Sequence, residues 1–197
     1  MAELPDVMTY DAPTTPAGLR LLDTAARLFY EHGIRGVGVE LIAQDAGTTK
    51  KTLYDRFGSK DALVTVYLRR RGAQWQEHVL ACLTDRPDPG PDRLLAVFDA
   101  AAAWLDRQRR GCAFVNAFAE IGDRVDHPAL PVVRAEKAWM RGLFTALAEE
   151  ASYDDPGTLG AQLHLLYEGA VVAVTAGAEA DGLTHARSAA ARLLAVG

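Results

Sequence analysis

A cluster of hydrogen-bond donors lies in the segment TTKKTLYDRFGSK, residues 48–60. The donors are hydroxyl and ammonium groups, carried by Thr48, Thr49, Lys50, Lys51, Tyr54 and Lys60. Such groups suit the oxygens of phosphate and the acceptor atoms on the edge of guanine. An isolated pair of lysines usually only solvates a helix surface, but this pair stands among further donors and two helix caps. The segment therefore predicts contact with a polyanion.

The charge of the chain is unevenly distributed, and its basic part contains this segment. The formal net charge is −5 at pH 7. Residues 19–71 hold ten lysines and arginines against six acids, whereas residues 72–197 hold eleven against seventeen. A locally basic region on an acidic body is typical of a protein that binds nucleic acid with one face only.

Two short helices joined by a tight turn are predicted to position the donors. The segment from Val39 to Ala46 has helical apolar spacing and stops at Gly47, and Thr49 can then cap a second helix that runs to about Phe57. This order of elements is a helix-turn-helix. In that motif the first residues of the second helix meet base edges in the major groove, while flanking groups hold phosphates.

Helical spacing of apolar residues continues through the rest of the chain, with no convincing alternating run. The other predicted helices cover residues 16–32, 60–84, 92–109, 112–121, 127–151, 156–178 and 184–195. The first sixteen residues contain three prolines and no periodicity, so we expect a mobile N-terminal arm over residues 1–16. The expected fold class is all-α.

The block LLDTAARLFYEHGIRGVGVELIAQDAGTTKKTLYDRFGSKDAL closely resembles the DNA-binding domain of the TetR (tetracycline-repressor-like) family of bacterial transcription regulators. The resemblance covers about residues 17–67, and its most specific parts are AARLFYEHG, IAQDAG and TLYDRFGSKDAL. It implies a three-helix DNA-binding domain over residues 17–60, followed by a helical-bundle domain for ligand binding and dimerisation over residues 61–197. It also implies a repressor that a small effector releases from a palindromic operator.

Two residues depart from the usual pattern of this family. Gly38 stands where such proteins usually carry a threonine that caps the second helix and touches phosphate, so one backbone contact is expected to be weaker. Thr48 stands where the family usually has a valine. The two side chains have a similar shape, but threonine adds a hydroxyl group that needs a hydrogen-bond partner.

The last two predicted helices favour a homodimer. Small residues let helices approach closely, and those on the first of these helices are Gly160, Gly169, Ala173 and Gly177. Two recognition helices on one face of a duplex read half-sites about one turn apart. Packing within one chain is the alternative, but these helices are long, terminal and richly apolar. The resemblance implies a four-helix interface with two helices from each subunit.

Aromatic residues are frequent in the predicted helices beyond the helix-turn-helix. They are Trp104, Phe114, Phe118, Trp139, Phe144 and Tyr167, with His164 nearby in sequence. An aromatic set at helical spacing is often only core, but the resemblance implies an effector pocket in this region. Because few polar groups accompany the aromatics, we expect a largely hydrophobic small molecule.

An all-helical enzyme or small-molecule-binding protein without DNA-binding activity is the alternative. His164 and Glu168 are an i, i+4 pair, which on a helix is commonly just hydrogen-bonded. A Glu-x-x-His pattern is absent, and Cys82 and Cys112 lack the spacing of metal ligands. We expect no enzymatic activity, no cofactor and no metal.

The expected location is the cytoplasm. No apolar stretch approaches the ~20 residues that span a bilayer, and the first sixteen residues have no signal-peptide core. The expected partners are a double-stranded DNA operator, a small effector and a second copy of the chain, with no membrane.

Overall fold

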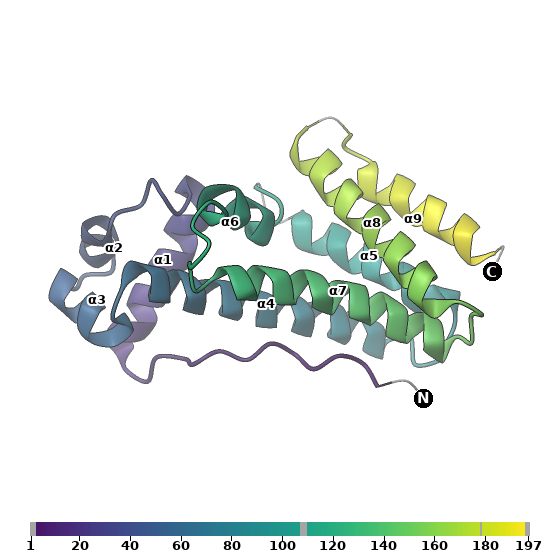
Figure 1. The fold of residues 1–197 in the computed structure, drawn as a ribbon, viewed down its shortest axis with the longest axis horizontal. Helices are drawn as coiled ribbons and strands as arrows, with labels where there is room; N and C mark the ends of the chain where they lie inside the picture. The colour runs from purple at the N-terminus through teal and green to yellow at the C-terminus, as the bar shows by residue number, and fades with distance from the viewer. Residues whose placement is uncertain (1–2, 107–109, 178, 196–197) are drawn as a thin grey trace. The chain divides into compact units, whose positions relative to one another are not determined.

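The computed structural model describes residues 3–106, 110–177 and 179–195, which contain α-helices and no strand (Figure 1). The helices are α1 (Pro16–His32), α2 (Val39–Asp45), α3 (Lys50–Phe57), α4 (Lys60–Thr84), α5 (Pro91–Leu105), α6 (Ala113–Ile121), α7 (Leu130–Glu150), α8 (Pro156–Thr175) and α9 (Gly182–Leu194). The predicted all-α class is confirmed. None of the described helices is long and apolar enough to cross a membrane.

Local capping residues set several helix boundaries. The side chain of Thr15 accepts a hydrogen bond from the Gly18 N–H at the start of α1, and Gly33 ends that helix with φ +83°. Asp155 caps α8 in the same way by accepting from the Thr158 N–H at 3.0 Å. These boundaries are readable from sequence because each cap depends on neighbouring residues only.

Several predicted helices differ from the structure near their ends. The helix predicted over residues 127–151 begins three residues later, because the chain first makes turns that include a bond from the His127 N–H to the Arg124 carbonyl at 2.8 Å. The helix predicted over residues 92–109 is helical to Leu105. Residues 107–109 of that prediction lie outside the described residues, as does residue 178 of the helix predicted over residues 156–178, which is helical to Thr175.

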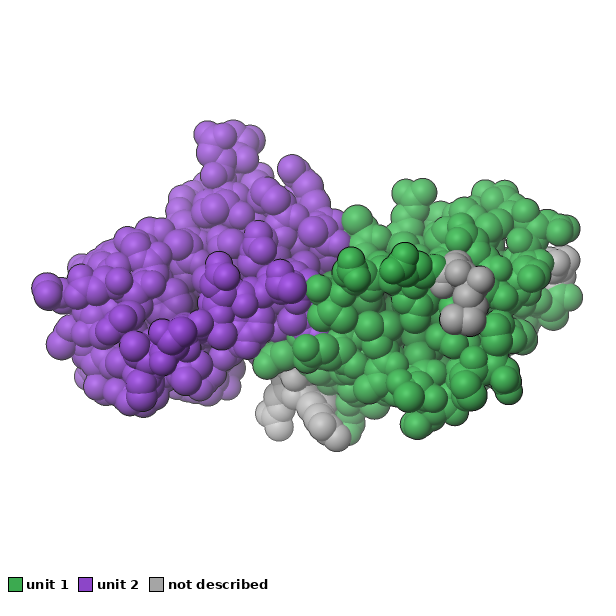
Figure 2. Space-filling model, turned by 90° about the horizontal axis from the view of Figure 1, so that it is seen from below, with its two compact units in different colours: residues 1–7, 74–112, 137–197 green, residues 8–73, 113–136 purple. Residues whose placement is uncertain are grey.

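The chain divides into two compact units (Figure 2). Unit 1 consists of residues 1–7, 74–112 and 137–197, and unit 2 of residues 8–73 and 113–136. The boundary expected at residue 60 differs from this grouping, because the first part of α4, all of α6 and the start of α7 belong to the unit that holds the helix-turn-helix.

Unit 2 is built around α1, α2 and α3, which contact one another. Leu21, Ile42 and Leu53, one from each helix, are fully buried. The rings of Phe29 on α1 and Tyr67 on α4 lie with centroids 5.8 Å apart. Burying a large apolar side chain stabilises a fold by about 1.5–3 kcal/mol, so this core fixes the orientation of the short helices.

Unit 1 has a separate apolar core in which α9 packs on both α5 and α8. Figure 1 shows α8 and α9 running side by side. Phe98 and Phe144 are almost completely buried, with ring centroids 5.7 Å apart. The N-terminal segment joins this unit, because the indole N–H of Trp139 donates to the carbonyls of Pro5 at 3.2 Å and Asp6 at 2.9 Å.

Candidate nucleic-acid interface

The turn between α2 and α3 is closed by local hydrogen bonds. Gly47 adopts φ +61°, a conformation that favours glycine. The N–H of Thr48 donates to the carbonyl of Ala43 at 2.8 Å, and its hydroxyl lies 3.4 Å from the same oxygen. The extra hydroxyl relative to a valine is therefore satisfied. Thr49 then caps α3 by accepting from the Thr52 N–H at 3.1 Å.

The first turns of α3 present exposed donors around one buried anchor. Leu53 is fully buried, whereas the side chain of Lys51 is 87% exposed and Tyr54 is 41% exposed. Lys51 lies 3.5 Å from the carboxylate of Asp55, an exposed i, i+4 pair that contributes little stability. The hydroxyl of Tyr54 and the ammonium of Lys51 are thus available to an external partner.

Lys50 is oriented by a residue of the preceding helix. Its Nζ donates to Oε1 of Glu40 at 2.5 Å and lies 5.9 Å from the centre of the Tyr54 ring. The mutual hydrogen bond lowers the pKa of Glu40 and raises the pKa of Lys50, so both groups are charged at neutral pH. Gly38, just before α2, offers no side-chain cap, as the missing threonine implied.

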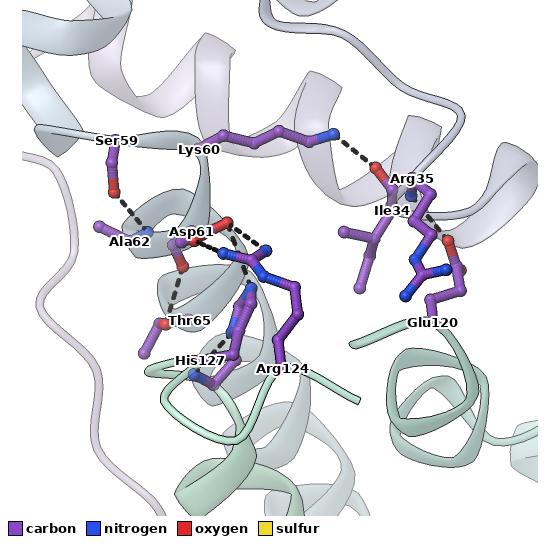
Figure 3. Close-up of polar contacts among 11 residues, drawn as sticks. Ile34, Arg35, Ser59, Lys60, Asp61, Ala62, Thr65, Glu120, Arg124 and His127 are labelled. Carbon is purple, nitrogen blue, oxygen red and sulfur yellow. Dashed lines mark hydrogen bonds and ion pairs between the residues drawn. The ribbon is translucent and has the colours of Figure 1, made fainter. Parts of the chain in front are cut away.

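Lys60, at the start of α4, is already engaged within unit 2 (Figure 3). Its Nζ donates to the carbonyl oxygen of Ile34 at 2.6 Å. Burial lowers the pKa of Lys60 from its ordinary value. The carbonyl takes one of the three N–H donors of this ammonium. The helix itself is capped by Ser59, whose hydroxyl accepts from the Ala62 N–H at 3.0 Å.

Asp61 connects the start of α4 to the loop between α6 and α7 (Figure 3). Its carboxylate accepts two hydrogen bonds from the guanidinium of Arg124, one of them at 3.1 Å. These bonds hold the pKa of Asp61 below its ordinary value. The two-bond geometry of an arginine–carboxylate pair fixes both direction and distance, so this contact anchors the first turn of α4.

His127 completes the contact from the same loop. Its Nδ1 accepts from the Ala129 N–H at 3.1 Å, so the proton of the neutral ring sits on Nε2, 3.2 Å from Oδ1 of Asp61. The side chain is buried, and this burial lowers the pKa of His127, with the nearby Asp61 offsetting part of the effect. The imidazole is therefore neutral at pH 7.

Arg35 joins the loop after α1 to α6 and to the loop that follows α6. Its backbone N–H donates to Oε2 of Glu120 at 2.7 Å, and its guanidinium donates to Asp123 at 2.6 Å. A Cβ atom on Gly33 would lie only 2.9 Å from the Glu120 carboxylate. Together with its positive φ, this crowding explains why glycine ends α1.

Comparisons with known proteins identify the family to which this helix-turn-helix chain belongs. The sequence model of the bacterial regulatory proteins of the tetR family matches residues 21–66. A TetR-family transcriptional regulator from Streptomyces coelicolor is 33% identical, with a TM-score of 0.77 over 90% of this chain and 95% of that one. A putative TetR-family regulator from Streptomyces avermitilis is 32% identical, with a TM-score of 0.76 over 90% and 98% of the two chains. The chain belongs to the TetR family.

Curated relatives match a shorter part of this TetR-family chain. An uncharacterised HTH-type transcriptional regulator of Mycobacterium tuberculosis is 30% identical over 105 residues, 49% of this chain. The match spans 52% of that relative's own length, about half. The HTH-type transcriptional repressor DhaR of a Mycobacterium species is 28% identical over 127 residues, 64% of this chain and 63% of the repressor.

The aromatic residues predicted to bind an effector fall into both units of the TetR-family chain. Phe114 is buried in unit 2, and Phe118 is 51% exposed on the same helix, α6. The others lie in unit 1 and are Trp104, Trp139, Phe144, His164 and Tyr167. The prediction that all of these residues line one effector pocket stays a prediction.

Within unit 1, one aromatic cluster includes four of these residues, which are Trp104, Phe144, His164 and Tyr167. Tyr167 stacks on Trp75 with centroids 6.2 Å apart and on His164 with centroids 6.4 Å apart. Trp104 lies 5.5 Å from Trp75 and 5.2 Å from His78. Trp75 and His78, both on α4, were missed as site candidates because their helical spacing is equally typical of core.

A charged group lies beside this aromatic cluster. The carboxylate of Glu168 accepts from Nζ of Lys137 at 2.9 Å and lies 3.4 Å from Nε2 of His164. Burial raises the pKa of Glu168, but the bonds from His164 and Lys137 outweigh that effect, so the pKa lies below its ordinary value. The side chains are 16–24% exposed, so a charged pair sits at the margin of an apolar core.

The small residues predicted for a dimer interface have different positions on α8. Gly160 is buried against α7 of its own chain, where a Cβ atom would meet Thr145 at 2.4 Å, so it does not fit an interface. Ala173 packs near Gly182 of α9. Gly177 follows α8 with φ +77°, and Gly169 has open space around it.

Gly169 lies within an exposed apolar strip of α8. Leu165 is 71% exposed and Val172 is 50% exposed, and with Gly169 they occupy positions i, i+4 and i+7 of one helix face. The sequence pattern of small residues predicted an interface on α8 but did not distinguish the faces of this helix. Leu165 and Val172 mark its exposed apolar face, and an interface there stays a prediction.

Proposed function

We propose that this TetR-family chain is a homodimeric transcriptional repressor that binds a two-fold operator in duplex DNA and leaves it when a small molecule binds. The observation that carries the proposal is the capped recognition helix α3, which exposes Lys51 and Tyr54 beside the Glu40–Lys50 pair. Exposed donors at the front of the second helix are what major-groove binding requires. The repressor DhaR, among the relatives, is consistent with the direction of regulation.

The homodimer is supported by the strip of Leu165, Gly169 and Val172 on α8. Contiguous exposed apolar residues commonly mark protein interfaces. A two-fold interface uses the same patch on both subunits, and a helix with glycine at its centre allows a second helix to approach closely. Two recognition helices are then related by two-fold symmetry, which suits a palindromic operator.

The effector site is proposed for unit 1, at the aromatic cluster of Trp75, Trp104 and Tyr167 with the neighbouring Glu168–Lys137 pair. Aromatic faces bind apolar or planar groups, and a few polar groups fix their orientation. The proposed effector is therefore a mainly apolar small molecule with a polar group that can reach Glu168 or Lys137. This adds a polar group to the largely hydrophobic molecule expected from sequence.

Selection of bound duplexes from a random pool tests the proposed function. A repressor of this kind should enrich a palindrome whose half-sites are about one helical turn apart. Its binding should weaken steeply with salt, because phosphate contacts release counter-ions. Tyr54→Phe should weaken binding without changing the enriched sequence, since a phosphate contact carries no base preference. Enrichment of no sequence, or binding insensitive to salt, would contradict the proposal.

A further inference from the structure

Glu40 is an acid placed beside the recognition helix. It lies in the first turn of α2, and its side chain is 68% exposed. Its carboxylate bonds Nζ of Lys50, the first residue of α3, whose side chain is 51% exposed. The centre of the Tyr54 ring lies 5.9 Å from this ammonium. Lys50 is thus oriented by Glu40 and offers a positioned donor rather than a freely moving charge.

Stability gives this acid only a small role, since a carboxylate in the first turn of a helix contributes little where it is exposed. An exposed ion pair contributes little to folding, about 0–1 kcal/mol. On a surface that binds phosphates, a carboxylate also repels the ligand and neutralises one of the few cations available. Glu40 therefore weakens general DNA affinity, and a base contact that favours a carboxylate would offset this loss.

The major-groove edge of a G·C base pair provides such a contact. Guanine presents two acceptors, N7 and O6, and the paired cytosine presents the N4 amino donor next to them. Lysine pairs with the guanine acceptors and glutamate accepts from the cytosine amine. In an A·T pair the amino donor lies between two acceptors and the thymine methyl group follows. An adjacent donor and acceptor therefore match the G·C edge better.

We propose that Glu40 and Lys50 act as one unit that reads a single G·C base pair in each half-site, with Lys50 on guanine and Glu40 on cytosine. This inference rests on the proposed function, since it requires α3 in the major groove of an operator. It makes Glu40 a specificity-determining residue. The carboxylate lowers affinity for DNA in general, and in exchange it improves discrimination between base pairs. Lys51, whose carboxylate partner lies on its own helix, takes no part in this reading.

The test measures dissociation constants for the selected operator and for operators altered at each symmetric position. Wild-type protein should prefer G·C at one position of each half-site by about tenfold or more. Glu40→Ala and Lys50→Ala should each lose most of that preference at the same position. The double variant should lose no more than either single variant, because both side chains act on one base pair. Replacing that guanine by 7-deazaguanine, which lacks N7, should weaken wild type but not Lys50→Ala.

Asp55→Ala is the matched control. Asp55 is 60% exposed and pairs with Lys51 on α3, so its removal changes the surface charge by the same amount. It should leave the preference at the G·C position intact. Thermal unfolding of every variant checks that the exposed substitutions leave the fold unchanged.

Two results separate the inference from the function on which it rests. If wild type selects no operator, the proposed function fails and the inference fails with it. If wild type selects a palindrome but Glu40→Ala strengthens binding to all sequences alike, Glu40 is only a counter-ion of Lys50. In that case the base-pair assignment is overturned while the proposed function stands.

Discussion

The ammonium of Lys60 and the carbonyl oxygen of Ile34 are hydrogen-bonded at 2.6 Å, which joins the start of α4 to the loop after α1. The bond is partly shielded, since burial lowers the pKa of Lys60. The structure thus gives this lysine a partner within unit 2, whereas its position in the first turn of α4 also favours contact with a phosphate.

Lys60→Met separates the two roles. If the bond to Ile34 is maintained on DNA, the variant should lose about 1 kcal/mol of unfolding free energy, the value of a partly exposed charged hydrogen bond. The dependence of operator affinity on salt should not change. Thermal unfolding and titrations at several salt concentrations measure both quantities. A salt slope reduced in magnitude by about 0.9 per protomer, with stability intact, would instead assign Lys60 to a phosphate.

The contact of Asp61 with Arg124 and His127 predicts how stability depends on pH. The pKa of His127 is lowered in the folded chain, so below about pH 6.5 the unfolded chain takes up a proton that the folded chain does not. The unfolding free energy should therefore decrease as pH falls below that value. The pKa of Asp61 is also lowered, which adds a second decrease below about pH 4 as its carboxylate protonates.

Two variants assign these decreases to their residues. His127→Asn keeps an acceptor for the Ala129 N–H but cannot titrate, so the decrease just below pH 6.5 should shrink. Asp61→Asn should lower stability at pH 7 by about 1 kcal/mol after allowance for solvent screening, and should reduce the decrease below pH 4. Denaturant unfolding across pH 3–8 provides the measurement. Identical pH profiles for wild type and both variants would contradict the assignment.

The sequence predicted the elements of this fold well because their signals are local. Thr15, Gly33 and Thr49 act on residues within one or two helical turns. The starts and ends of these helices could therefore be predicted without knowing the tertiary structure. The bonds that orient the interface are not local. Lys60 reaches a carbonyl 26 residues away, and Asp61 binds a guanidinium 63 residues away. The sequence showed that Lys60 and Asp61 are charged, but it did not show which groups they bind.

The candidate site was partly predictable for the same reason. The exposed donors of α3 follow from the helix-turn-helix pattern, but Glu40 was missed, since no periodicity links it to Lys50 across the turn. The aromatic residues had the right chemical type, yet sequence could not show that Phe118 is half exposed on α6 while Tyr167 is buried in unit 1. Burial on a helical body depends on the neighbouring helices.

Trp139 is predicted to hold the N-terminal segment as well as to fill the core. Its ring is 7% exposed, and its N–H donates to the carbonyls of Pro5 and Asp6. Trp139→Phe keeps an aromatic ring but removes both bonds, so it should cost about 1–2 kcal/mol and release residues 3–7. Amide exchange at these residues should accelerate. Trp104→Phe, in the aromatic cluster, is the control and should leave that exchange unchanged.

Gly169→Glu is predicted to separate the proposed dimer without unfolding the monomer. Gly169 has open space around it and sits between Leu165 and Val172 on the exposed strip of α8. Replacing glycine inside a helix favours that helix by up to about 1 kcal/mol, so the monomer should remain stable. In a closely packed two-fold interface the new carboxylate would be buried without a partner and would face its own copy, which is strongly unfavourable. Operator affinity should fall with the dimer, although no residue of α3 is changed.

Gly142→Glu provides the control for this last prediction, because Gly142 lies on α7 of the same unit and also has open space around it. Sedimentation equilibrium should then give a monomer mass for Gly169→Glu and a dimer mass for both wild type and Gly142→Glu. Thermal unfolding should show all three chains folded. A dimer mass for Gly169→Glu would place the interface away from the strip of Leu165, Gly169 and Val172, whereas a monomer mass for wild type would contradict the dimer itself.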